Sequence, residues 1–130
     1  MGRMLVEATL KDAHATLAAA IDQPGAAVLG KDAGEMVGAP CGVAISSDSD
    51  AGIAQASCLI DFTRPEGTLQ HLESCRRHGT AIVIGTTGFD AVGKKAIAAA
   101  AQDIPVVFAP NMSVGVNVVF KLLDVAARIM

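Results

Sequence analysis

The chain has 130 residues, enough for a single domain, and 52% of them are hydrophobic while 18% are charged. This balance supplies the material for a buried core and excludes a disordered chain. The formal net charge is -3, and Trp and Tyr are both absent. A nucleic-acid-binding protein is therefore not expected, because it would need a basic face or an aromatic stacking platform.

Compartment and membrane signals are the next constraint. The three cysteines contain no C-x-x-C pair, which is typical of small buried hydrophobes in a reducing compartment. Residues 1–15 carry charges where a signal peptide would have an apolar centre. No apolar run approaches the roughly 18 residues of a membrane span. We expect a cytoplasmic protein with no membrane partner.

The first half of the chain predicts short elements around a long loop. An amphipathic pattern predicts a helix over residues 4–10, with no strand before it. A strand is predicted over residues 16–21, ending at Asp22. A loop rich in glycine and proline occupies residues 23–42, and loops of this length are often functional or mobile. A short strand and a short helix are predicted next, over residues 43–45 and 51–56.

The second half predicts three strands, each followed by a helix. The apolar runs that indicate strands are residues 58–60, 81–84 and 105–108. We expect Thr63 to cap the first helix in a capping box with Glu66, Thr87 to cap the second, and Ser113 to cap the third. The last helix carries one apolar face, including Val119 and Leu123.

Alternating strands and helices define the α/β class, with an open parallel sheet. Ligands of such sheets bind beyond the carboxyl ends of the strands. The residues expected at those ends are small or polar: Asp22, Asp61–Arg64, Gly85–Gly88 and Ala109–Ser113. Four such loops favour a nucleotide-binding crevice, in which glycines admit close approach and helix N-termini attract an anion.

Other kinds of site find little support in the sequence. We interpret His14, His71 and His78 as exposed helix histidines, far apart and without metal-ligand spacing. The chain has no nucleophile elbow, no Walker-type phosphate loop and no carboxylate pair that stands out as an acid/base couple. No metal site is expected.

The sequences of three loops resemble those of the dihydrodipicolinate reductases. These are the 4-hydroxy-tetrahydrodipicolinate reductases of bacterial lysine and diaminopimelate biosynthesis. The matching stretches are Ile60–Gly67, Ile84–Phe89 and Ala109–Asn117. The resemblance covers essentially the whole chain. It implies a Rossmann-type doubly wound parallel sheet that binds NADH or NADPH and serves an oxidoreductase.

The resemblance also implies which residues contact the cofactor. These are Met1, Gly2, Asp22, Thr63, Arg64, Gly85, Thr86, Thr87, Ala109, Pro110, Asn111 and Met112. Thr63 and Arg64 would lie near the nicotinamide. Where the family often has Arg after the acidic residue, this chain has Gln23. NADH is therefore expected over NADPH, since Asp22 would repel the additional phosphate with no cation to offset it.

The resemblance further predicts that residues 1–130 are an incomplete dinucleotide-binding domain. Met1-Gly2-Arg3 matches only the tail of the family's glycine-rich fingerprint, so a first strand is expected to be missing. The family's acid/base residues lie in a second domain that binds the dicarboxylate substrate and builds a homotetramer. That domain would begin after Met130, so no catalytic residue is assigned here. We expect a catalytically silent and unstable fragment.

Two alternatives remain open from the sequence. One is a domain of another Rossmann oxidoreductase, such as an amino-acid or sugar dehydrogenase. The other is a non-catalytic module that senses NAD(H) and acts through a partner.

Overall fold

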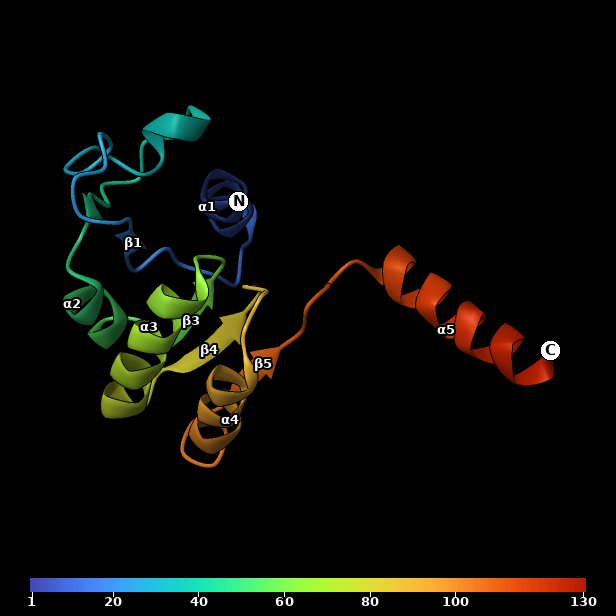
Figure 1. Cartoon of the computed structure of the whole chain (residues 1–130). Helices are drawn as coiled ribbons and strands as arrows, with labels where there is room; N and C mark the ends of the chain where they lie inside the picture. Colours follow the sequence, from blue (N-terminus) through green and yellow to red (C-terminus); the bar gives the residue numbers. More distant parts are fainter.

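A computed structural model describes all residues, 1–130, and shows an α/β chain (Figure 1). All strand pairs within its sheets are parallel, as predicted. The elements in chain order are α1 (Gly2–Lys11), β1 (Ala20–Ile21), the 3₁₀ turn η1 (Glu35–Val37), β2 (Ile45–Ser46), α2 (Ser49–Ala54), β3 (Cys58–Asp61), α3 (Pro65–His78), β4 (Ala81–Ile84), α4 (Ala91–Ala100), β5 (Val106–Phe108) and α5 (Val114–Ile129).

The five strands form two separate sheets where the sequence predicted one. β3, β4 and β5 pair in that order, and β1 pairs with β2. The sheets are separate because no strand of the chain pairs with both β1 and β3. Strands β1 and β3 therefore each keep one edge without a partner. Helix α2 connects the two sheets. Its buried Ile53 belongs to the larger core, and Ile21 of β1 packs against the same core.

The main core lies between the three-stranded sheet and helices α3 and α4. Ile82 and Ile84 of β4 are fully buried against Leu72 of α3 and Ile97 of α4. These strands are continuous apolar runs, a pattern typical of parallel strands in sheets covered on both faces. The opposite face of the sheet is uncovered: Ile60 is 44% exposed and Val107 56% exposed.

A second, smaller core joins α1, η1 and the β1–β2 pair. Val6 of α1, Ala33 and Ile45 of β2 are its buried members. The loop over residues 23–42 is held by one carboxylate, Asp32, which accepts hydrogen bonds from the N–H groups of Gly34, Cys41 and Gly42 at 2.6–3.1 Å. This loop is therefore ordered by a charged group at its centre.

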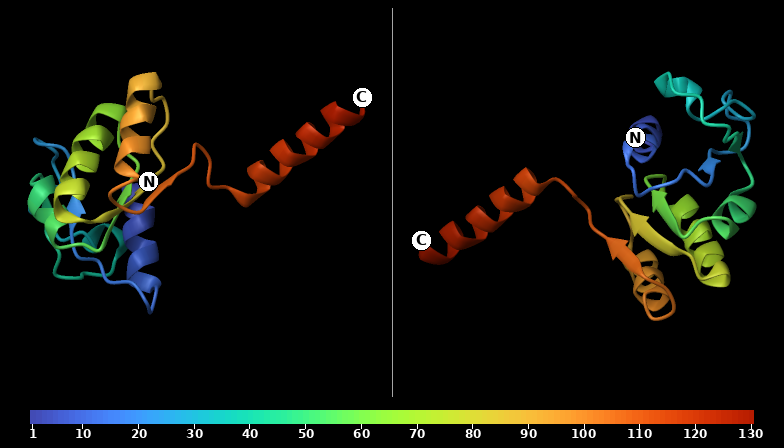
Figure 2. Two further views of the ribbon diagram at one scale, coloured as in Figure 1. Left: turned by 90° about the horizontal axis from the view of Figure 1, so that it is seen from below. Right: turned by 180° about the vertical axis from the view of Figure 1, so that it is seen from behind.

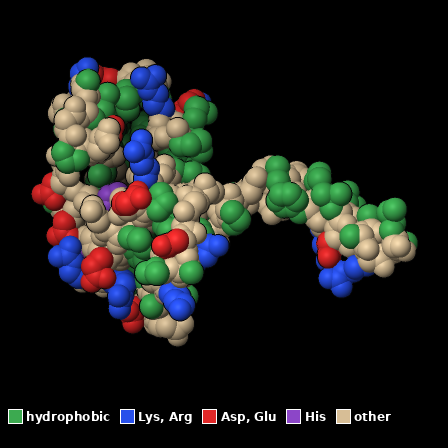
Figure 3. All heavy atoms as spheres, in the orientation of Figure 1, with side chains coloured by type: hydrophobic (Ala, Val, Ile, Leu, Met, Phe, Trp, Pro, Cys, Tyr) green, Lys and Arg blue, Asp and Glu red, His purple; other side chains and the backbone are tan.

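Helix α5 extends away from both cores (Figures 1 and 2). None of its residues is buried, and hydrophobic side chains cover much of its visible surface (Figure 3). Its charged residues pair with one another, since Lys121 and Arg128 both contact Asp124. A bilayer-spanning helix is not found among the helices, all of which are too short or too polar.

Two predicted helix caps are wrong. Helix α3 has Arg64 as its N-cap residue, without a side-chain cap, and Thr63 lies before it. The Thr63 hydroxyl donates to Asp61 instead, at 2.7 Å. Helix α4 is capped by Asp90, whose carboxylate accepts the Gly93 N–H, and not by Thr87. The Ser113 cap of α5 is confirmed.

Acid should loosen the loop around Asp32. The pKa of Asp32 is lowered from 3.8 to about 2, chiefly by the hydrogen bond from the Cys41 N–H. Partial burial acts to raise this pKa, and the hydrogen bonds from the N–H groups of Gly42 and Gly34 lower it further. Because the folded-state pKa lies below the unfolded value, the stabilisation is complete above about pH 4 and is lost as pH falls through 2. Amide hydrogen exchange at Cys41 and Gly42 should accelerate over this window. A rate that follows only the intrinsic pH dependence of exchange would refute the role of the carboxylate.

Candidate dinucleotide-binding site

Three of the four predicted loops meet at one edge of the sheet. Asp61 pairs with Ile84, and Ile84 pairs with Phe108, so β3, β4 and β5 end side by side. The main chain continues this contact beyond the strands, because the Gly85 N–H donates to the carbonyl of Asp61 at 2.8 Å. The loops that follow therefore form one continuous edge of small and polar residues.

A buried carboxylate organises the first two loops. Asp61 is 2% exposed and accepts hydrogen bonds from the N–H and hydroxyl of Thr63 at 2.8 and 2.7 Å. Nδ1 of His71 lies 2.8 Å from its other oxygen, and the hydroxyl of Thr86 lies 3.4 Å away. Burial acts to raise the pKa of Asp61, but the hydrogen bonds from His71 and Thr63 outweigh it and hold the pKa below its ordinary value. The carboxylate is therefore ionised at neutral pH.

Gly85 is required by the ring of Phe62. A Cβ placed on Gly85 would lie 2.1 Å from the Phe62 ring, far inside van der Waals contact. The close approach predicted at this glycine is thus made by a side chain of the neighbouring loop. Gly88 has a different reason to be glycine, since its φ of 89° lies in the left-handed region that L side chains rarely adopt.

An aromatic pair connects β5 to the loop after β4, and the start of α5 bonds to the loop that follows β5. The rings of Phe89 and Phe108 meet edge to face, with centroids 5.5 Å apart. Beyond Phe108, Asn117 donates its side-chain amide to the carbonyls of Asn111 and Ser113 at 3.0 and 2.9 Å. These bonds tie Asn111, one of the four predicted cofactor residues in Ala109–Met112, to the start of α5.

Groups suited to an anion lie at the β3 end of this edge. Arg64 is exposed, and its guanidinium forms no ion pair in the structure. The first turn of α3 lacks a side-chain cap and begins with Pro65, so the N–H groups of Glu66 and Gly67 are free to bind an acceptor. Thr87 is exposed, but Thr86 is buried and its hydroxyl already bonds within the protein. Arg64, Thr63 and Thr87 are therefore the accessible polar side chains of the first two loops.

The remaining predicted cofactor residues lie elsewhere. Asp22 follows β1 in the other sheet, where its carboxylate accepts the Gln23 N–H at 2.7 Å. Met1 and Gly2 begin α1, which packs in the smaller core. The structure thus brings together the loops after β3, β4 and β5, and does not place Asp22, Met1 or Gly2 in contact with them.

The interpretation of the histidines is wrong for His71. Its side chain is 15% exposed and is paired with the buried Asp61. His78 also faces a carboxylate, Asp50, at 3.1 Å, and His14 lies in a turn and not in a helix. The sequence contained one usable signal: His71 lies three residues after Thr68 and four before Cys75, which are both buried, so helical spacing places it on the inward side of α3.

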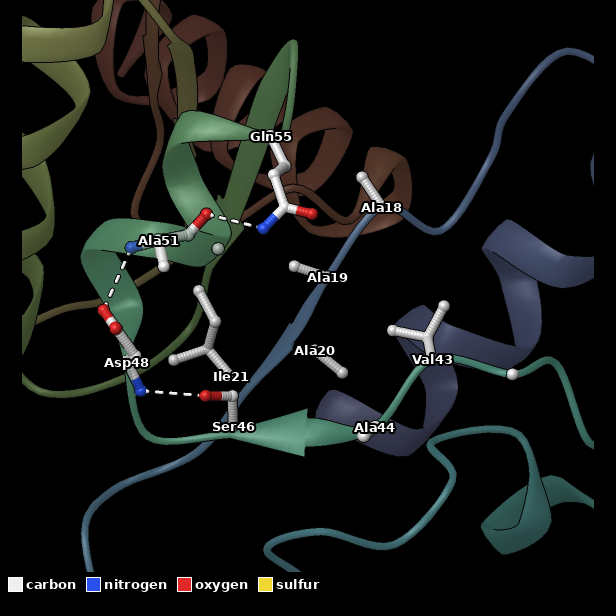
Figure 4. A pocket seen from close by; sticks show the side chains of 12 residues that line it. Ala18, Ala19, Ala20, Ile21, Val43, Ala44, Ser46, Asp48, Ala51 and Gln55 are labelled. Atoms are coloured by element: carbon white, nitrogen blue, oxygen red, sulfur yellow. Dashed lines mark hydrogen bonds between the residues drawn. The ribbon is translucent and has the colours of Figure 1, made fainter.

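The structure also contains a cleft of about 290 Å³ between β1, β2 and α2 (Figure 4). Its walls include many small side chains, such as Ala19, Ala20 and Ala51. Its one carboxylate, Asp48, accepts the Ala51 N–H as the cap of α2. This cleft offers few free polar groups and does not include the loops after β3, β4 and β5.

Small, polar loops at adjoining ends of parallel strands define a nucleotide-binding α/β domain of the Rossmann type. The sequence matches the family described as dihydrodipicolinate reductase, N-terminus, over residues 1–112. The chain therefore belongs to the dihydrodipicolinate reductase family, of which it contains the N-terminal, nucleotide-binding part.

Curated relatives agree with this assignment. Over all 130 residues the chain is 65% identical to 4-hydroxy-tetrahydrodipicolinate reductase of Dechloromonas aromatica, 64% identical to that of Aromatoleum aromaticum and 60% identical to that of Bordetella parapertussis. It covers 48%, 47% and 48% of those proteins. The chain thus spans about half the length of the curated relatives it matches.

Replacing Gly85 should test the packing of this edge. Gly85→Ala forces the Phe62 ring to move, and overpacking of this kind costs about 1–3 kcal/mol. Urea unfolding should show the loss. Gly115→Ala is the matched control, because its new Cβ meets nothing closer than 3.9 Å and it lies within α5. Equal stability of both variants would contradict the close contact.

Proposed function

We propose that the chain is the cofactor-binding part of a 4-hydroxy-tetrahydrodipicolinate reductase. The reaction is hydride transfer from NADH or NADPH to the dicarboxylate precursor of lysine and diaminopimelate. The observation that carries the proposal is the continuous edge formed by the loops after β3, β4 and β5, in a chain of this family.

The residues of this edge suit a dinucleotide. Uncapped N–H groups at the start of α3 and the unpaired guanidinium of Arg64 favour a phosphate or another anionic group. The buried Asp61 carboxylate accepts hydrogen bonds from Thr63, His71 and Thr86 and is not exposed at the loop surface. When bound, the nicotinamide supplies the hydride, and the chain's own residues hold and orient it.

Catalysis requires groups that this chain does not contribute. No residue of the edge is placed as a general acid, so we propose that protonation and binding of the dicarboxylate depend on a substrate domain outside residues 1–130. The same domain would build the homotetramer. The relatives' greater length supports a further domain, since the chain covers 48% of the first of them.

We also propose that a further parallel strand lies between β1 and β3. Each of these strands has an edge without a partner, and a strand that paired with both would unite the two sheets. Such a union would bring the end of β1, with Asp22, into line with the end of β3. The adenosine ribose contact expected of Asp22 belongs to that joined sheet.

Cofactor titrations test this function. NADH should bind the chain, and binding should quench or shift the fluorescence of its reduced nicotinamide ring. The same titration with reduced nicotinamide mononucleotide, which lacks the adenosine half, should give no saturable signal. A protein that contains the substrate domain should in addition oxidise NADH when the dicarboxylate precursor is present. NADH binding without any such oxidation would favour a sensing module over a reductase.

The choice between the two cofactors should depend on residue 23. Gln23 is uncharged and follows Asp22, whose carboxylate would repel the 2′-phosphate of NADPH. In a protein whose joined sheet brings Asp22 to the cofactor edge, we expect NADH to bind more tightly, and Gln23→Arg to improve NADPH binding by about tenfold, which corresponds to about 1.4 kcal/mol. Gln55→Arg serves as a control away from Asp22. Tighter NADPH binding by that protein before any substitution would reverse the assignment.

A further inference from the structure

Asp61 carries a charge that is almost completely buried at the end of β3. Its two oxygens accept hydrogen bonds from three residues of three segments: Thr63 of its own loop, Thr86 of the next loop and His71 of α3. Because an ionised carboxylate only accepts hydrogen bonds, the His71 Nδ1 must carry the proton that it shares with Asp61. A buried charge of this kind is costly unless each contact is kept.

Threonine hydroxyl groups extend the hydrogen bonding that begins at the Asp61 carboxylate. Thr68, which is fully buried in α3, donates to the Thr86 hydroxyl at 2.9 Å and lies 3.3 Å from the Thr63 hydroxyl. The β3 loop, the β4 loop and α3 are therefore joined by one hydrogen-bonded network. We call Asp61, Thr63, Thr68, His71 and Thr86 the Asp61 network.

Its position matters because the two loops it joins form the proposed cofactor edge. Main-chain N–H groups hold a ligand best when they are already in place before binding, since ordering a loop on binding costs affinity. Without the network, the β3 and β4 loops would be connected mainly by the Gly85–Asp61 main-chain bond and by the contact of Phe62 with Gly85.

We propose that His71 and Asp61 are positioning residues, which set the two loops of the cofactor edge through this network without touching the cofactor themselves. The proposal rests on the cofactor-binding function proposed above. It assigns to a helix histidine and a buried aspartate a role in the affinity for the dinucleotide.

A second pair on the same helix provides an internal comparison. His78, at the other end of α3, lies 3.1 Å from Asp50 of α2, which also binds Ser74 and Arg77. That pair is exposed and connects two helices, with no loop of the cofactor edge involved. Loss of His78 should therefore remove a histidine–aspartate contact of similar length without affecting the edge.

The experiment compares variants of the full 130-residue chain by NADH titration. His71→Phe keeps an aromatic side chain but removes the donor, and should weaken NADH binding by about tenfold, the equivalent of about one charged hydrogen bond. His71→Asn restores a donor near the Nδ1 position and should return the affinity to within about threefold of the unmodified chain. His78→Phe should leave the affinity within about twofold.

A second measurement keeps the proposal testable if His71→Phe does not fold. Thr68→Val preserves shape and removes only the hydroxyl that joins the two loops, and it should weaken binding by about threefold while accelerating amide exchange at Thr63 and Gly85. Equal loss of affinity in His71→Phe and His78→Phe would overturn the positioning role, as would failure of His71→Asn to restore it. If the unmodified chain does not bind NADH at all, the proposed function fails and the positioning role fails with it. Normal binding in His71→Phe overturns the positioning role alone.

Discussion

The parallel register of β3, β4 and β5 is the constraint on which the site depends. Asp61, Ile84 and Phe108 are aligned across the sheet, so the residues after them must emerge side by side. Buried isoleucines of β4, packed under α3 and α4, fix that register because a slip by one residue would turn them to the open face. The position of the loops is thus set by apolar packing that contains none of the ligand-binding groups.

Polar interactions then fix the loops after β3 and β4 more closely in the positions that apolar packing gives them. The charge of Asp61 is buried where β3 ends, and its hydrogen bonds draw in the next loop and the first turns of α3. The Phe62 ring packs directly against Gly85, so the loops after β3 and β4 are also in close van der Waals contact.

Hydrophobic runs and capping residues in the sequence correctly predicted several strands and one helix cap. The runs at residues 58–60 and 81–84 became β3 and β4, and Ser113 caps α5 as expected. The Thr63 cap was wrong because a buried carboxylate two residues earlier competes for the same hydroxyl. His71 was misread because its partner lies ten residues away on another element, and helical spacing alone does not reveal such a contact. The division into two sheets depends on long-range pairing, which periodicity cannot predict.

The central claim is that the adjoining ends of β3, β4 and β5 bind a pyridine dinucleotide. Mapping amide chemical shifts by NMR during an NADH titration tests it most directly. We predict that the saturable changes concentrate in residues 61–64, 85–88 and 109–113, while the amides at the far ends of α3 and α4 stay unchanged. Saturable shifts confined to the cleft beside α2, or an absence of saturable shifts, would contradict the account.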